Sequence, residues 1–342
     1  MNTELLKSLA AASAPSGAES PVAKLIEKEI APFCDEVTYD KIGNLIARIS
    51  PKNGTPEKKN MFVAHMDEVG FMVKNIDNDG RVRIALLGNV DTRALSGRRV
   101  MLSSGVYGIV AAKPIHVLSG GELSKPTSVK SLYIELGSKD KAETDEIIHV
   151  GDCGTFEPKF TAMKNGRFAG KALGGRSCVM LLCEMIRGIK AEELKDELYF
   201  VFSVKREIAK RQFGVETAAF TINPDSAVIL DAAASADFDG VSTFERGAKC
   251  GGGVVLAPAD MKTIYDRTAF ADAVSYCEEN QIAYQYPATA AGEGTEAGGV
   301  HRSGVGIPSL SIGIPTRNLR SGAEIVNEKD LDAAEKLLWH LI

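Results

Sequence analysis

Apolar residues recur at helical spacing near both ends of the chain. Residues 3–12 predict a first helix, which the turn-forming sequence at 15–17 ends. A second helix is expected to follow, with Ser20 as its N-cap and Pro21 in its first turn. After Asn327, apolar positions again follow one helical face. The pattern therefore predicts a terminal helix that begins at Asn327.

Between residues 69 and 160 the pattern changes to short alternating runs. The runs 70–76 and 81–86 flank the turn sequence 77–80, which predicts a β-hairpin. Further short apolar runs follow, separated by Gly and Ser, and no long helical period interrupts them. We therefore expect a small β-barrel-like domain over 69–160, inserted into an α/β domain formed by 1–68 and 161–342.

An alternation of apolar runs and helical patterns returns after residue 160. It predicts a helix over 177–189 and strands at 197–204, 227–230 and 309–314. A further strand is predicted before the inserted segment, at 61–64. In open α/β sheets, ligands bind beyond the carboxyl ends of the strands. Polar residues follow the predicted strands at those ends: His65 and Asp67, Arg206 and Glu207, Asp231, and Arg320. Imidazole and carboxylates converging in this way are typical of hydrolytic metal sites.

Composition and charge narrow the possible functions. The 342 residues carry a net charge of −5, which argues against nucleic acid or an anionic membrane as the partner. No apolar run is long enough to span a bilayer, and the N-terminus lacks a signal-peptide pattern. Six dispersed cysteines include no C-x-x-C pair. This usage is typical of reduced cysteines, so we expect a cytoplasmic protein.

Seven short segments along the whole chain carry a further pattern. They are Pro15-Ser16-Gly17, 64–71, Gly170-Lys171-Ala172-Leu173 with Arg176, 200–204 with Glu207, Ile229-Leu230-Asp231, 294–298 and Ile314-Pro315-Thr316-Arg317. In type and order these segments resemble the glutamyl-aminopeptidase family of dinuclear, TET-type metallo-aminopeptidases, some of whose members carry endoglucanase labels. The resemblance implies a catalytic α/β domain, an inserted β domain, and self-association up to a tetrahedral dodecamer.

The resemblance also implies roles for four residues. His65 and Asp231 match ligands of the first metal, and Glu207 matches a ligand of the second. Asp67 matches the carboxylate that orients the imidazole of His65.

Three other positions depart from the family pattern. Gly174 stands where the family has the Asp that bridges both metals. Arg206 stands in place of the general base Glu, and Arg320 in place of the late His ligand. Glycine has no ligating atom, and arginine neither ligates a metal nor accepts a proton. We therefore expect a degenerate site.

Charge supports that expectation. The family's six positions would sum to −4, which two divalent ions offset, whereas here Arg206 and Arg320 balance Glu207 and Asp231. We predict that one of the two arginines pairs with Glu207 where the second metal would lie.

Cys178, one helical turn beyond Gly174, is either a substitute bridging ligand or a buried packing residue. We expect no cofactor or one weakly bound zinc or cobalt ion, not two metals.

Three functions remain to be compared. The first is an inactive pseudo-peptidase that acts by binding a peptide or small molecule, or by assembling with copies of itself. The second is an active aminopeptidase with a rearranged mononuclear site that uses His65, Asp231 and Glu207. The third, a glycosidase using Glu207 and Asp231, rests on family labels alone, and the chain's single tryptophan offers little sugar stacking.

Overall fold

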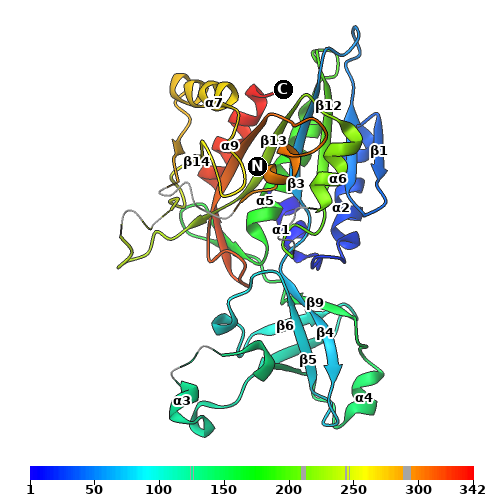
Figure 1. Ribbon diagram of the computed structural model, residues 1–342, viewed down its shortest axis with the longest axis vertical. Coiled ribbons are helices and arrows are strands. Elements are labelled where there is room, and N and C mark those ends of the chain that lie inside the picture. The colour runs from blue at the N-terminus through cyan, green and yellow to red at the C-terminus, as the bar shows by residue number, and fades with distance from the viewer. Residues whose placement is uncertain (124, 126, 209–212, 243–244, 246, 288–293) are drawn as a thin grey trace.

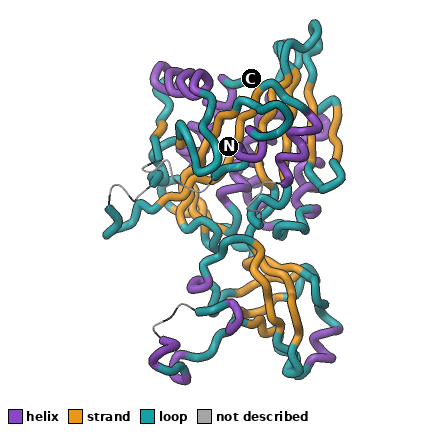
Figure 2. The backbone as a smooth tube through the Cα atoms, viewed as in Figure 1, coloured by secondary structure: helices purple, strands orange, loops and turns teal. Residues whose placement is uncertain are grey.

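The structure is a computed structural model that describes all residues except 124, 126, 209–212, 243–244, 246 and 288–293. Figure 1 shows two parts: a layered α/β body that contains both termini, and a smaller β-barrel at one end of it. The tube view in Figure 2 shows strands through the middle of the body and helices on its outside.

The elements within the described residues are as follows. The α-helices are α1 (Thr3–Ala11), α2 (Ser20–Ile30), α3 (Gly120–Leu123), α4 (Lys141–Asp145), α5 (Leu173–Gly188), α6 (Phe213–Ile222), α7 (Arg267–Glu279), α8 (Ala297–His301) and α9 (Glu328–His340). The strands of the body are β1 (Glu36–Tyr39), β2 (Leu45–Ile49), β3 (Lys59–His65), β10 (Thr161–Met163), β11 (Arg167–Gly170), β12 (Glu197–Ser203), β13 (Ser226–Ser235), β14 (Val254–Leu256), β15 (Tyr284–Gln285), β16 (Ser309–Arg317) and β17 (Glu324–Asn327). The strands of the barrel are β4 (Gly70–Ile76), β5 (Val82–Leu87), β6 (Arg99–Leu102), β7 (Tyr107–Ala111), β8 (Tyr133–Glu135) and β9 (Cys153–Phe156).

One mixed sheet runs through the body in the order β1-β2-β12-β3-β13-β16-β17-β11-β10. Its central strands β12, β3, β13 and β16 are parallel, and the outer pairs are antiparallel. The carboxyl ends of the parallel strands therefore meet at one edge, where ligands of such sheets bind.

Helices cover both faces of this sheet. Along β3, Phe62 and Ala64 pack into the core under α1, α2, α5 and α9, whereas Met61 and Val63 pack into the core under α6 and α8. Because successive strand residues point to opposite faces, a continuous apolar run is what a strand buried on both faces requires. The prediction of an α/β body is confirmed.

The barrel closes in the order β4-β5-β8-β7-β6-β9 around its own apolar core. Its predicted hairpin is present as β4 and β5, and Gly80 in the turn has φ +75°. A Cβ atom at Gly80 would lie 2.7 Å from the Asp140 carbonyl oxygen, so the turn requires glycine. The barrel strands lie within 70–156, and the domain limits at 68/69 and 160/161 stay a prediction.

The predicted start of the second helix is wrong by one residue. Ser20 is the first helical residue, and Glu19 occupies the N-cap without a side-chain bond to the helix. The carboxylate of Glu19 is used elsewhere: it accepts hydrogen bonds from the Gly17 and Lys205 backbone N–H groups. Sequence position alone could not reveal this bond to a segment 186 residues away.

Several predicted elements are longer than expected. The helix predicted at 177–189 begins at Leu173, because Gly174 and Gly175 are helical here despite their low intrinsic propensity. The strands β13 and β16 run three to five residues beyond their predicted ends, since they pair with each other as far as Ser235 and Arg317. The terminal helix begins at Glu328, one residue after its predicted start, and Asn327 is its N-cap, with a side chain that accepts from the Lys329 backbone N–H.

Two further expectations concern cysteines and membranes. All six cysteines are free thiols, as predicted. Among the described helices, none has the length and apolar character needed to cross a bilayer.

Candidate functional site

The site lies where β3 stops and its neighbour β13 continues. The register pairs Ala64 with Leu230, one residue before β3 ends at His65. Asp231 is the next residue of β13, and its Oδ1 lies 3.7 Å from His65 Nε2. The prediction that Asp231 follows the end of a strand is wrong, because the strand continues through it. The predicted proximity of His65 and Asp231 is confirmed.

Asp67 is the centre of the hydrogen-bond network around His65. Its carboxylate accepts from the Arg206 backbone N–H at 3.0 Å, the Glu207 backbone N–H at 2.8 Å and the Ser16 hydroxyl. His65 Nδ1 lies 3.3 Å from Asp67 Oδ1. This geometry fits the orienting role proposed for Asp67. Burial would raise the pKa of Asp67, but the hydrogen bonds from His65 and Ser16 outweigh it and lower the pKa.

Two arginines hold the carboxylates beside His65. Arg206 donates from Nη2 at 2.8 Å and from Nε at 3.2 Å to Asp231 Oδ2. Arg320 donates from Nε to Glu207 Oε2 at 2.7 Å. Arg206 Nη1 lies 3.5 Å from the same Glu207 oxygen. The prediction that an arginine pairs with Glu207 is confirmed, and both arginines do so.

The charges within this cluster shift the pKa values of its side chains. Burial would lower the pKa of His65, but Asp67 and Asp231 raise it to about 9. Burial would raise the pKa of Asp231, but the charge of Arg206 lowers it. Burial likewise opposes the charged form of Arg206, yet Asp231 and Glu207 raise its pKa above the ordinary arginine value. The ion pairs therefore keep these groups charged in spite of their burial.

Gly174 and Gly175 let the N-terminus of α5 approach the site closely. A Cβ atom at Gly175 would lie 2.7 Å from His65 Cε1, and one at Gly174 would lie 2.7 Å from Ala232 Cβ. Both distances are shorter than real Cβ contacts, so neither position has room for a side chain as the structure stands.

Glu324 on β17 is a site residue that sequence reasoning missed. Its carboxylate accepts from the Gly174 backbone N–H at 2.9 Å and from the Arg320 backbone N–H at 2.7 Å. Burial raises its pKa to about 7. Glu324 thus anchors both the start of α5 and the residue that pairs with Glu207. No local motif marks it, because its partner Gly174 is 150 residues away.

Two other buried groups adjoin the cluster. The Cys178 thiol lies 3.3 Å from the Gly174 carbonyl oxygen on its own helix, and burial raises its pKa well above the ordinary thiol value. This geometry favours the packing interpretation of Cys178. Glu296, at the start of α8, accepts from the Ser203 hydroxyl at 2.7 Å, and burial raises its pKa to about 7. The sequence placed Glu296 in a motif but gave it no role.

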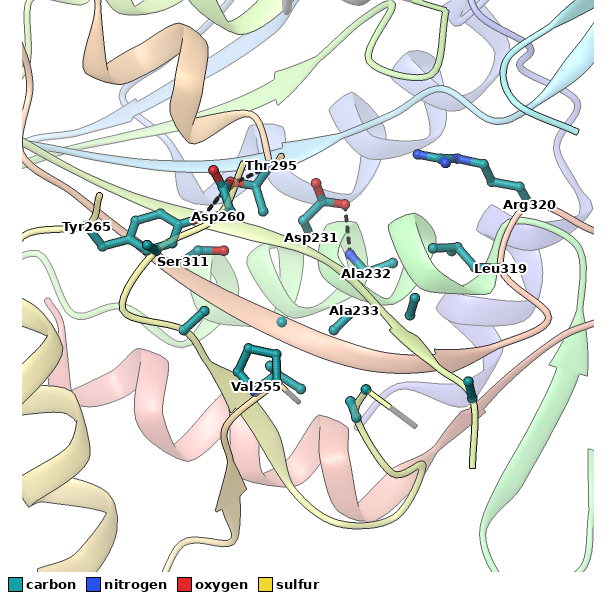
Figure 3. A pocket seen from close by; sticks show the side chains of 18 of the residues that line it. Asp231, Ala232, Ala233, Val255, Asp260, Tyr265, Thr295, Ser311, Leu319 and Arg320 are labelled. Carbon is teal, nitrogen blue, oxygen red and sulfur yellow. Dashed lines mark hydrogen bonds between the residues drawn. The ribbon is translucent and has the colours of Figure 1, made fainter. Parts of the chain in front are cut away.

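A cavity of about 470 Å³ opens beside this cluster. Figure 3 shows Arg320 and Leu319 at one end and Asp231, Ala232 and Ala233 along the middle. The other end is lined by the polar side chains of Asp260, Tyr265 and Thr295. Its volume lies within the range of about 300–1,000 Å³ that small-molecule sites occupy.

The side chains around His65 do not form a metal-binding group as they stand. Within the described part of the chain, no three His, Cys, Asp or Glu side chains are arranged to hold a metal ion. Asp231 and Glu207 are bonded to guanidinium groups instead, and Gly174 offers no ligating atom. In this structure Asp231 and Glu207 therefore pair with cations of the protein itself.

Comparison with known proteins identifies close similarity over nearly the whole chain. The sequence model of the M42 glutamyl aminopeptidase family matches residues 43–337. The lysyl aminopeptidase of Pyrococcus furiosus is 28% identical over 356 residues, covering 99% of this chain and 96% of that protein.

Solved structures agree with this similarity. The TET aminopeptidase of the archaeon Thaumarchaeota archaeon SCGC AB-539-E09 matches with a TM-score of 0.93 and 31% identity, over 99% of this chain and 95% of that one. A peptidase of Pyrococcus horikoshii that assembles into a tetrahedron or a large octahedral shell matches with a TM-score of 0.86 and 28% identity, over 99% of this chain and 98% of that one.

Proposed function

Because the chain belongs to the M42 glutamyl aminopeptidase family, we propose that it is a member that has lost peptide hydrolysis and acts by binding a ligand or by self-assembly. The observation that carries the proposal is the pairing of Arg206 with Asp231 and of Arg320 with Glu207. These guanidinium groups form ion pairs with Asp231 and Glu207, the two carboxylates that match metal ligands in the family resemblance.

Charge and chemistry support the proposal in different ways. Two cations beside His65 repel a divalent ion, and burial strengthens that repulsion because the local dielectric constant is low. Arg206 and Arg320 each expose only 10% of their side-chain surface. Their partners Asp231 and Glu207 expose 2% and 7%. In addition, arginine cannot act as the general base that hydrolysis requires at the position of Arg206.

A second candidate is an active aminopeptidase with one metal ion. The observation in its favour is that His65 Nε2 and Asp231 Oδ1 lie 3.7 Å apart. Glu207 lies 3.5 Å from Arg206, which also pairs with Asp231. One ion bound by His65 and Asp231 would require Arg206 to release Asp231. Chelation should then abolish turnover, and one equivalent of metal should restore it.

Metal content and hydrolysis test the two candidates together. We expect near zero zinc or cobalt per chain by elemental analysis after incubation with either ion, and negligible release of aminoacyl chromogenic groups. One metal per chain with turnover that His65→Ala abolishes would favour the mononuclear enzyme. Two metals per chain would contradict the proposed function and the positions assigned to Gly174, Arg206 and Arg320.

Self-association is the second part of the proposal. Support comes from the match over 99% of the chain to a peptidase that assembles into a tetrahedron or an octahedral shell. We expect light scattering coupled to size-exclusion chromatography to give a mass several times that of the 36.5 kDa chain, up to a dodecamer. A mass of one chain at micromolar concentration would contradict this expectation.

A further inference from the structure

The cavity beside Arg206 exists because small residues line it. Asp231 is followed by three alanines, Ala232 to Ala234, and Ala257 and Gly313 line the hollow as well. Side chains this small leave about 470 Å³ next to the β13 and β16 strands. Methyl groups and exposed Cα atoms give an apolar lining suited to a hydrocarbon or aromatic body.

Arg206 is a hydrogen-bond donor among the residues that line this cavity. A guanidinium group has five N–H donors in a fixed plane and accepts none. Arg206 gives Nε and Nη2 to a single oxygen of Asp231, and its Nη1 reaches no closer than 3.5 Å to Glu207. Arg206 also lines the cavity, and Asp231 accepts only its Nε and Nη2 groups.

The polar side chains at the far end of the cavity form hydrogen bonds with one another. Asp260 accepts from the Tyr265 hydroxyl at 2.7 Å and from the Thr295 backbone N–H at 2.7 Å, and the Thr295 hydroxyl lies 2.8 Å from that of Tyr265. Figure 3 shows these side chains turned toward one another. The remaining lining carboxylate, Glu245, is exposed at the rim and accepts from Ser242. Polar selectivity is therefore expected from the groups that line the rest of the cavity, Arg206 among them.

We propose that the cavity binds a small carboxylate whose apolar body lies on the alanine lining and whose head accepts N–H groups of Arg206. The proposal rests on the proposed function, because it needs Arg206 in place and the two metals absent. A carboxylate accepts two parallel N–H bonds from a guanidinium group, which a neutral amide oxygen matches only in part. An ammonium group in the same place would face Arg206 with like charge.

A matched series of three ligands tests the head group. Octanoate, octanamide and octylamine share one apolar body and differ only in the head, so calorimetric titration of the full chain compares carboxylate, amide and ammonium directly. We expect octanoate to bind at least about tenfold more tightly than octanamide, since hydrogen bonds to charged groups exceed neutral ones. We expect no measurable binding of octylamine.

Two variants should change this preference in opposite directions. Asp231→Asn removes the charge that competes for Arg206, so octanoate should bind more tightly than to the wild type. Arg206→Met combined with Asp231→Asn removes the donors without leaving an unpaired buried carboxylate, so the preference for octanoate over octanamide should fall to about twofold or less. Arg48→Met is the matched control, because Arg48 also pairs with two carboxylates but lies outside the cavity.

A third variant tests the location. Ala233→Leu places a larger side chain in the cavity and should weaken octanoate and octanamide alike by at least about tenfold, with no change in head-group preference. Equal affinity for octanoate and octanamide, preference for octylamine, or no binding at millimolar concentration would overturn the carboxylate proposal. If such a result came with near zero metal per chain, the proposed loss of hydrolysis would still stand. Two metals per chain would overturn both.

Discussion

Lys171→Met is expected to destabilise the chain by about 3 kcal/mol, because it leaves the carboxylate of Glu68 buried without its main cation. Lys171 Nζ lies 2.7 and 2.9 Å from the two Glu68 oxygens, and the two side chains expose only 1% and 2% of their surface. Arg176, 3.5 Å away, and the Ala14 backbone N–H remain near Glu68 and limit the loss. Chemical denaturation of the two proteins measures the difference.

The chain provides a matched control for this substitution. Lys52 pairs with Glu192 at 2.8 Å, nearly the same separation, but both side chains are about 60% exposed. Lys52→Met should therefore change the free energy of unfolding far less than Lys171→Met does. Combining Lys171→Met with Glu68→Gln should recover part of the stability, since no unpaired charge then remains. Similar losses for Lys171→Met and Lys52→Met would contradict the argument from burial.

The same ion pair also supports the candidate site. Glu68 directly follows Asp67, and its Oε1 accepts from the Ala14 backbone N–H. Lys171 donates to the Ala12 carbonyl oxygen and precedes the start of α5. The pair therefore ties the N-terminal segment, the loop after β3 and the helix under His65 to one another. A chain with Lys171→Met that still folds should hold Asp67 less rigidly.

Local patterns predicted the elements that each segment determines by itself. The apolar run before His65 predicted β3, and the turn sequence before Arg81 predicted the hairpin of the barrel, because both signals depend on neighbouring residues only. The arginine pairing of Glu207 was also predictable, because charge balance among the candidate positions required a partner for each carboxylate.

Features that depend on distant partners could not be predicted in this way. The extension of β13 past Asp231 comes from pairing with β16, more than 80 residues later. Glu324 joins the site through backbone N–H groups of Gly174 and Arg320, which leave no mark on composition or periodicity. The alanines after Asp231 read as ordinary strand residues, and only the three-dimensional arrangement shows that they line a cavity.

Restoring the metal site should require a fourth substitution beyond the three that the family pattern suggests. A Cβ atom at Gly174 would lie 2.7 Å from the Cβ of Ala232, and a methyl group on a paired strand cannot rotate away. Gly174→Asp with Arg206→Glu and Arg320→His should therefore fold poorly and bind little metal. Adding Ala232→Gly removes the clash. Arg320 has φ +63°, a region that histidine tolerates better than most side chains, so that position needs no backbone change.

The fourfold variant should then bind about two zinc or cobalt ions per chain, against the near zero expected for the wild type, because its carboxylates are no longer paired with arginine. With a carboxylate at the base position, metal-dependent hydrolysis of aminoacyl chromogenic substrates should rise at least about 10²-fold above the wild type. His65→Ala in the fourfold background should return activity to the wild-type level. Equal metal content in the threefold and fourfold variants would show that the Ala232 contact does not limit the site. Metal binding by Ala232→Gly alone would show that the arginines do not exclude metal, and would contradict the proposed loss of hydrolysis at its origin.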